Sequence, residues 1–324
     1  MRLVVVAALV ALGMVALTLA LEDGSTRPDH PERLAARVAA PTWALRVLAP
    51  TVPAAAEPSG PGALKWIGKM GMASGFCPEP GEKQTPQAAE ARRAALQQVR
   101  SQIEAEFATL QQGGVTLRSA PEAQSSAPDL LRTVLQSLEE AAAATGTRRR
   151  EVLQVVVYRD RSELLAVTCT PSWVGGVFDG TLRLISGASE PVIRHETLHA
   201  QLAPFVRSAP LWFHEGLAQW FADRGQLQWT RPLTLMAHNQ TYIPFASLND
   251  SFLVLTGARD ADLAYSQSAA MVAWLVSEHG ASVVVEAVSY FAAGGTPNGL
   301  FRHLRPNGSL DEASFLQFLV SRAP

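Results

Sequence analysis

The sequence predicts an α+β fold in which a small mixed sheet is followed by helices, all within residues 151–324. Two short runs of β-branched and apolar residues, 152–158 and 182–185, are typical of buried strands. After them, apolar residues recur at steps of three and four, as on the buried face of a helix. The expected helices are the segment between Ser189 and Pro204, residues 212–221, residues 265–279, and a last helix that begins with Ser309 and Glu312 in capping-box spacing.

The part of the chain that precedes this domain is expected to include a helical region at residues 85–150. Apolar residues recur at helical spacing from Leu96 to Leu110, and the pattern ends at a pair of glycines. A second amphipathic stretch runs from Leu131 to Leu138. These apolar stripes indicate packing surfaces rather than ligand sites.

Two further segments come before the helical region. Arg2 is followed by an uncharged, largely apolar run at residues 3–21, so residues 1–21 are expected to form a signal peptide or an uncleaved signal anchor. The protein is therefore expected to be exported, periplasmic or extracellular, or to stay anchored in the membrane through that run. Residues 22–84 are rich in Pro, Ala and Gly without sustained periodicity, which is typical of a linker.

The charge balance excludes one class of partner. With 27 basic and 29 acidic side chains the formal net charge is -2, whereas nucleic-acid binding needs a basic surface that neutralises phosphates. No nucleic-acid partner is expected, and no feature of the sequence indicates an oligomeric state.

The cysteine content leaves two interpretations open. Only Cys77 and Cys169 are present. In an exported chain they can form a disulfide, whereas the alternative is a pair of buried free thiols.

Residues His195, Glu196 and His199 form the pattern His-Glu-x-x-His, which is typical of a metal site on a helix. Positions four apart lie on one helical face, so both imidazoles can reach one cation, and Glu196 lies beside them near a metal-bound water. The alternative is an ordinary pair of histidines on a soluble helix, satisfied by solvent. A third ligand would argue against that alternative, because catalytic zinc commonly has three protein ligands and a fourth position for water.

The third ligand is expected in the aromatic-rich segment that begins at Pro210. This segment carries His214 and Glu215 side by side, and its aromatic residues would bury it against the metal helix. Adjacent helical positions point about 100° apart, so one metal can readily accept only one of the two. Imidazole and carboxylate both bind zinc, and ligand chemistry alone does not choose between them.

Four stretches resemble the peptidase MA-like domains of the gluzincin group of zinc metallopeptidases: residues 173–180, 195–199, 212–218 and 265–280. The resemblance covers residues 151–324. It implies a zincin-like fold, with Zn²⁺ bound by His195, His199 and Glu215 and with Glu196 as the general base.

Two positions depart from the pattern of that group. The residue before Glu215 is usually an asparagine in similar sequences, and it is His214 here. Gln219 stands one turn after Glu215, where a carboxylate would support a ligand histidine. A neutral amide at this position is expected to orient His195 but to raise its basicity less.

The activity that the resemblance implies is hydrolysis of peptide bonds in a peptide or protein substrate. Glu196 would take a proton from water and return it to the leaving amine. Tyr265 is the candidate for stabilising the oxyanion, with His238 as the substitute. An extended substrate is expected along the strand edge near residues 177–185.

Two other functions are compatible with the same residues. One is a non-catalytic binding module that keeps the zinc-containing fold, and the other is metal-dependent hydrolysis of a non-peptide bond. The intact Glu196 favours an enzyme, because a binding module needs no base beside the metal.

Overall fold

The computed structural model describes residues 85–170, 174–249, 258–305 and 310–324. The expected signal segment at residues 1–21, its export or anchoring role, and the linker at residues 22–84 lie outside the described residues. Cys77 also lies outside them, so the choice between a disulfide and free thiols is described only for Cys169, which is not a free thiol.

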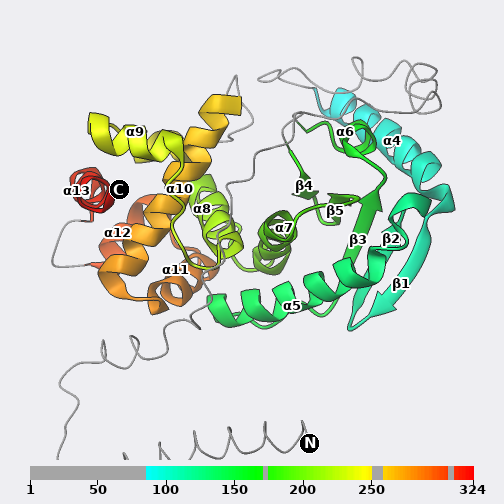
Figure 1. The fold of residues 1–324 in the computed structure, drawn as a ribbon, viewed down its shortest axis with the longest axis horizontal. Helices are drawn as coiled ribbons and strands as arrows, with labels where there is room; N and C mark the ends of the chain where they lie inside the picture. The colour runs from blue at the N-terminus through cyan, green and yellow to red at the C-terminus, as the bar shows by residue number, and fades with distance from the viewer. Residues whose placement is uncertain (1–84, 171–173, 250–257, 306–309) are drawn as a thin grey trace, which may run out of the picture. The chain divides into compact units, whose positions relative to one another are not determined.

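A five-stranded mixed sheet forms one half of the described chain (Figure 1), with the strands in the order β1-β2-β3-β5-β4. The strands are β1 (Ala108–Gln112), β2 (Val115–Ser119), β3 (Leu153–Tyr158), β4 (Gly176–Phe178) and β5 (Leu182–Ile185). β2 pairs with β3 and β3 with β5 in parallel, whereas β1 and β4 add antiparallel strands at the two edges. The structure therefore has the small mixed sheet that the sequence predicts, followed by helices.

The expected helical region at residues 85–150 is only partly helical. Helix α4 (Pro86–Ile103) ends ten residues before the glycine pair, and β1 and β2 follow it as a hairpin. Gly113 and Gly114 form the turn with φ of 56° and 83°, which glycine adopts at low cost. Leu110 matched the helical spacing, but it is 37% exposed on β1 and belongs to no helix face.

This correction also affects the expected boundary after residue 150. β2 lies parallel to β3 along its whole length, from Val115 opposite Leu153 to Ser119 opposite Val157. The hairpin is thus part of the same sheet as the strands expected for residues 151–324. The second amphipathic stretch does form a helix, α5 (Ala127–Thr145), which Gly146 ends with φ of 65°.

Helices cover both faces of the sheet. On one face, α5 packs against β2 and α7 (Glu190–Leu202) against β4 and β5, and Val134, Ile193, Val155 and Leu184 belong to one core cluster. On the other face, α4 and α6 (Arg161–Thr168) enclose a smaller cluster around Tyr158. Successive side chains of β3 belong alternately to the two clusters, as expected for a strand that is buried on both faces.

The remaining helices form a second core beside the sheet. They are α8 (Leu211–Ala222), α9 (Arg231–Asn239), α10 (Ala258–His279), α11 (Ser282–Ala292), α12 (Pro297–Leu304) and α13 (Glu312–Arg322). α7 lies between the two halves, because Ile193 and Ala200 join the core of the sheet while Leu198 and Leu202 join the core of the helices. The helix that carries the metal motif is therefore held from both sides.

Two helix starts differ from the expected ones. α10 begins at Ala258, so Tyr265 lies inside it rather than at its start, and it ends as expected before Gly280. The capping box of α13 is formed by Asp311 and Ser314, and Ser309 lies outside the described residues.

Within the described parts of the chain no single helix is long and apolar enough to cross a membrane. α10 from Ala261 and α11 meet that test only as a pair bent by 113°.

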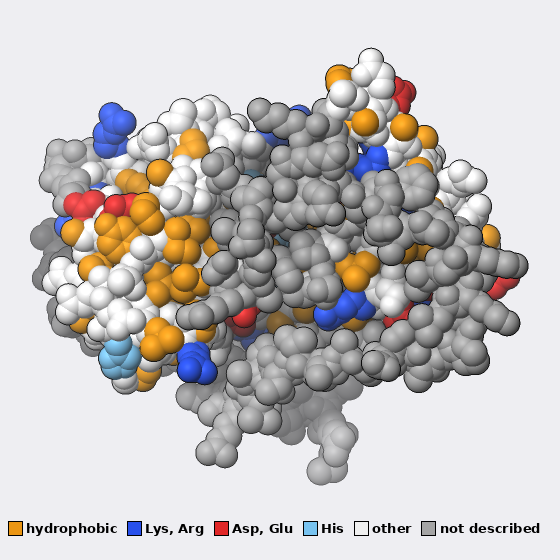
Figure 2. Space-filling view, turned by 90° about the horizontal axis from the view of Figure 1, so that it is seen from above, with side chains coloured by type: hydrophobic (Ala, Val, Ile, Leu, Met, Phe, Trp, Pro, Cys, Tyr) orange, Lys and Arg blue, Asp and Glu red, His pale blue; other side chains and the backbone are white. Residues whose placement is uncertain are grey.

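The surface of the helical half carries some hydrophobic side chains. Viewed from above, they gather at the left of the molecule (Figure 2). Leu235 of α9 and Val320 of α13 are each 44% exposed. They lie on the outer faces of their helices, whereas Leu233 and Leu319 face the core.

Candidate metal centre

His195 and His199 lie one turn apart on α7, and both side chains are largely buried. The helix begins after Ser189, an extended N-cap whose side chain makes no capping hydrogen bond, and Pro191 occupies the first turn, where a missing N–H costs nothing. It ends at Leu202, two residues before Pro204. This part of the structure follows the sequence prediction closely.

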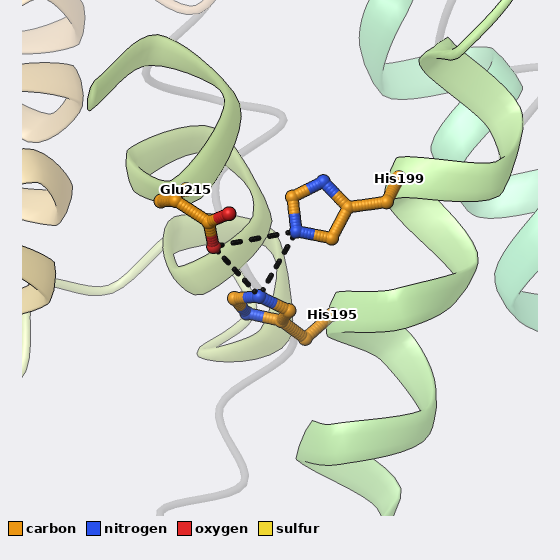
Figure 3. A group of neighbouring side chains, drawn as sticks. All are labelled: His195, His199 and Glu215. Atoms are coloured by element: carbon orange, nitrogen blue, oxygen red, sulfur yellow. Dashed lines mark hydrogen bonds and ion pairs between the residues drawn. The ribbon is translucent and has the colours of Figure 1, made fainter. Parts of the chain in front are cut away.

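Glu215 on α8 completes a group of three facing side chains (Figure 3). Its Oε2 atom lies 3.2 Å from Nε2 of His195 and 3.4 Å from Nε2 of His199, and the two Nε2 atoms are 3.1 Å apart. Ligands at about 2.0–2.1 Å from a tetrahedral zinc ion are separated by about 3.3 Å. The three atoms therefore already have the spacing of three corners of a zinc tetrahedron.

The electrostatics of this group also suit a cation. Burial by itself lowers the pKa of His199, but the Glu215 carboxylate outweighs this effect and raises the pKa to about 9. Burial by itself would raise the pKa of Glu215, but His199 and His195 hold it far below its usual range. A buried carboxylate that stays ionised beside two imidazoles is a donor set that fits a divalent metal.

Glu196 lies beside the group, against the edge strand β4. Burial raises the pKa of Glu196, and the neighbouring His195 and His199 oppose that rise. The main-chain N–H of Phe178 donates a hydrogen bond to its carboxylate. A Cβ atom on Gly176 would lie 2.9 Å from Cγ of Glu196, so only glycine lets the strand approach the glutamate this closely.

Tyr265 reaches the same place from α10. Its hydroxyl donates a hydrogen bond to Glu215, and its ring centroid is 6.2 Å from that of His195. Burial raises the pKa of Tyr265, and the charges of Glu215 and Glu196 add to the rise. His238, the alternative to Tyr265, is exposed in the last turn of α9. The structure therefore brings Tyr265, and not His238, to His195 and Glu215.

A glycine next to Glu215 explains how α10 comes so close to α8. A Cβ atom on Gly216 would lie 2.2 Å from the main-chain oxygen of Ser268. Ser268 lies about one turn after Tyr265 on the same helix. Because Gly216 has no side chain, α10 can approach α8 closely enough for Tyr265 to reach His195 and Glu215.

The two positions that depart from the gluzincin pattern have other partners. His214 donates to the main-chain oxygen of Val206, and its ring lies 6.5 Å from that of His199, to one side of the three facing atoms. Gln219 donates to Asp223 at 3.0 Å, which differs from the expectation that it orients His195. Asp223 carries the carboxylate that interacts electrostatically with His195.

Arg194 is a site-supporting residue that no sequence signal reveals. It is 4% exposed, it pairs with Glu140 of α5, and its guanidinium donates to the main-chain oxygen of Phe221. The same group lies 4.3 Å above the Phe221 ring. It thus joins α7 to the end of α8, the two helices that carry the ligands.

The sequence matches no protein-family model and no curated protein. Among solved structures, a two-domain M1 zinc metallopeptidase bound to L-tryptophan is similar at 17% identity and a TM-score of 0.31, over 68% of this chain and 52% of that one. The IMPa metallopeptidase from Pseudomonas aeruginosa is similar at 14% identity and a TM-score of 0.32, over 76% of this chain. The chain spans about half of the first and 35% of the second.

Likenesses of this size leave the assignment of function to the site itself. The small mixed sheet beside many helices is compatible with a metallopeptidase-like fold.

Proposed function

We propose that this protein is a zinc-dependent peptidase of the gluzincin type. The observation that carries the proposal is the convergence of His195, His199 and Glu215 at zinc-like spacing, with Glu196 next to them. A metal bound by two imidazoles and one carboxylate keeps a fourth position for water, as in catalytic rather than structural zinc sites.

Zinc bound there would make water more acidic and polarise a substrate carbonyl. Glu196 then accepts a proton from the water on its carboxylate and returns it to the amine that leaves. Tyr265 stays protonated at neutral pH and is able to donate a hydrogen bond to the developing oxyanion.

A peptide substrate is the one that the edge of the sheet favours. β4 pairs with β5 on one side only, and its position next to Glu196 brings an open strand edge to the base. An extended peptide can pair with such an edge through its main chain, whatever its side chains are. The substrate is therefore expected near Val177, whereas Ile185, the far end of the expected range, lies on the neighbouring strand β5.

The deciding experiment is digestion of a peptide library by the purified, zinc-loaded chain, followed by mass spectrometry. Cleavage is expected to stop with a zinc chelator, to return with added zinc, and to fall by about 10²- to 10⁴-fold in Glu196→Gln, which should keep its zinc. The Glu196→Gln protein, purified in parallel, also controls for contaminating peptidases. Equal cleavage by both proteins would refute the proposal.

The same experiment separates the two other functions. A binding module would retain zinc and cleave nothing, and a hydrolase of a non-peptide bond would leave the whole library intact but act on ester or amide substrates. The position of Glu196 between the ligands and β4 favours catalysis, because a binding module has no use for a base held at that point.

We also propose that the protein is exported, so that its substrates are periplasmic or extracellular peptides or proteins. The apolar run at residues 3–21 behind Arg2 supports this proposal. N-terminal sequencing of protein from its native host should begin near Leu21. A soluble cytoplasmic form that retains Met1 would refute export, and a membrane-bound form that retains Met1 would indicate an anchor.

A further inference from the structure

The edge strand β4 is short and has few neighbours of its own. It is three residues long and, among the described residues, pairs only with β5, yet it supplies the N–H of Phe178 to Glu196 and packs Gly176 against the same side chain. Strand edges of this kind are easily displaced unless something else holds them. The position of the base carboxylate therefore depends on what anchors β4.

Asp179, the residue directly after β4, is such an anchor. Arg183 of β5 donates from its Nε atom to both carboxylate oxygens of Asp179, at 3.1 and 3.0 Å. Arg100 of α4 donates to Oδ2 at 2.7 Å, and its Nε atom also donates to the main-chain oxygen of Val167. Asp179 is thus tied to the neighbouring strand and to a helix on the far face of the sheet.

The partner of Asp179 is itself fixed by a buried network. Arg183 is 6% exposed and donates to the Tyr158 hydroxyl at 2.5 Å and to Glu104 at 3.3 Å. The Tyr158 hydroxyl donates to Glu104 at 2.7 Å, and Arg118 pairs with the other oxygen of Glu104 at 2.7 Å. A fully paired network of buried charges holds its members in one geometry, so Arg183 offers Asp179 a rigid partner.

The turn after β4 transmits this anchoring to the site. The Asp179 N–H donates to the Thr181 main-chain oxygen at 3.2 Å, and its side chain accepts from the Thr181 N–H at 3.2 Å. Successive N–H groups of a strand point to opposite edges. Because the Asp179 N–H points into the turn, the Phe178 N–H points outward, to Glu196. A shift of Asp179 therefore changes the direction of the Phe178 N–H and with it the hydrogen bond to Glu196.

We propose that Asp179 is a positioning residue, which holds β4 so that the Phe178 N–H and the base Glu196 face each other, with Arg100 as its second tie. The expected effect on kcat rests on the proposed function, in which Glu196 is the base. The tie to Arg100 gives α4, which lies outside the part of the chain that resembles gluzincins, a role in the site.

The test compares the full-length, zinc-loaded protein with Asp179→Asn, Arg100→Gln and the control Asp129→Asn. Asp129 also forms an aspartate–arginine pair, with Arg132 at 2.8 Å, but both side chains are more than 70% exposed on α5. Three quantities are measured: zinc content, amide hydrogen exchange in peptides that cover residues 174–180 and 153–158, and kcat and KM separately on a cleaved peptide.

Asp179→Asn is expected to speed exchange at residues 174–180 while residues 153–158 stay protected and zinc content is unchanged. Its kcat should fall by about tenfold to a hundredfold, as for a displaced catalytic group. Arg100→Gln should also speed exchange at residues 174–180 and lower kcat, but by less, because Arg183 still holds Asp179. Asp129→Asn should change neither the exchange nor kcat.

Two results would overturn the inference. One is exchange at residues 174–180 that is the same in Asp179→Asn and the unmodified protein. The other is equally faster exchange in both peptides, which would show a general loosening of the sheet. If the unmodified protein cleaves no peptide, the proposed function fails, and the exchange data still decide whether Asp179 holds β4.

Discussion

Nε2 of His195 lies 3.2 Å from Oε2 of Glu215, although the two residues are 20 positions apart and belong to different helices. α8 packs against α7, and Arg194, which directly precedes His195, donates to the main-chain oxygen of Phe221 near the end of α8. This packing brings a buried carboxylate that stays ionised next to two imidazoles. Four predictions follow from this arrangement and its surroundings.

Glu215, rather than its neighbour His214, is expected to be the third zinc ligand. Glu215→Ala should weaken zinc binding by more than about a hundredfold, since outer partners of ligands alone are worth about 10- to 100-fold. His214→Asn should keep the metal, because its ring points to Val206. Metal content after dialysis against a mild chelator measures both. If His214→Asn loses zinc and Glu215→Ala keeps it, the ligand set and the gluzincin assignment are both wrong.

Zinc binding is expected to strengthen with rising pH. The pKa of His199 in the metal-free protein is raised from 6.5 to about 9, so this ligand must lose a proton before it can bind. Affinity should therefore rise by about tenfold per pH unit between these values. The stability of the metal-free fold is expected to change with pH in the opposite direction. The raised pKa of His199 stabilises this fold below pH 6.5, and the stability is lost as the pH rises through about 9.

Competition with a chromophoric chelator at a series of pH values measures the affinity, and thermal unfolding of the metal-free protein measures the stability. Glu215 stays ionised across the whole range, because its pKa is far below it. An affinity that does not change between pH 6.5 and 9 would contradict the prediction.

Tyr265→Phe is expected to lower kcat by about 10²- to 10³-fold, the usual cost of one oxyanion donor. KM and zinc content should change little, because the hydroxyl interacts with a ligand but is not one of the three facing atoms. Steady-state kinetics on a cleaved peptide give the answer, with His238→Ala as the control from the exposed end of α9. The role fails if the phenylalanine variant keeps its kcat.

Gly216→Ala is expected to destabilise the fold by about 1–3 kcal/mol, as overpacking does. The added Cβ would lie 2.2 Å from a main-chain oxygen of α10, which cannot move aside like a flexible side chain. Because α10 also carries Tyr265, kcat should fall as well. Denaturant unfolding measures the loss. Gly175→Ala is the control, since its Cβ would meet only Val192, at 3.7 Å; equal midpoints for the two variants would contradict the close contact.

Some features of this protein depend on residues that are close in the sequence, and these were predictable. His195, Glu196 and His199 share a helix between Ser189 and Pro204, so the common face of the two histidines, with Glu196 beside it, follows from the helical repeat alone. Strands β3 and β5 and helices α7, α8, α10 and α13 also follow from local sequence patterns, whereas the hairpin of β1 and β2 does not. The same reasoning failed at Leu110, where helical spacing occurred by chance on an exposed strand.

The sequence by itself thus determined the helix that carries the proposed metal site, the identity of its two histidines and the position of Glu196 beside them. Only the tertiary structure decided that Glu215 rather than His214 faces them, that Tyr265 reaches the site over Gly216, and that β4 lies against Glu196. The physical reason is that local periodicity specifies which way a side chain points from its own helix or strand. Which elements it then meets depends on the packing of two cores around α7, to which distant residues contribute.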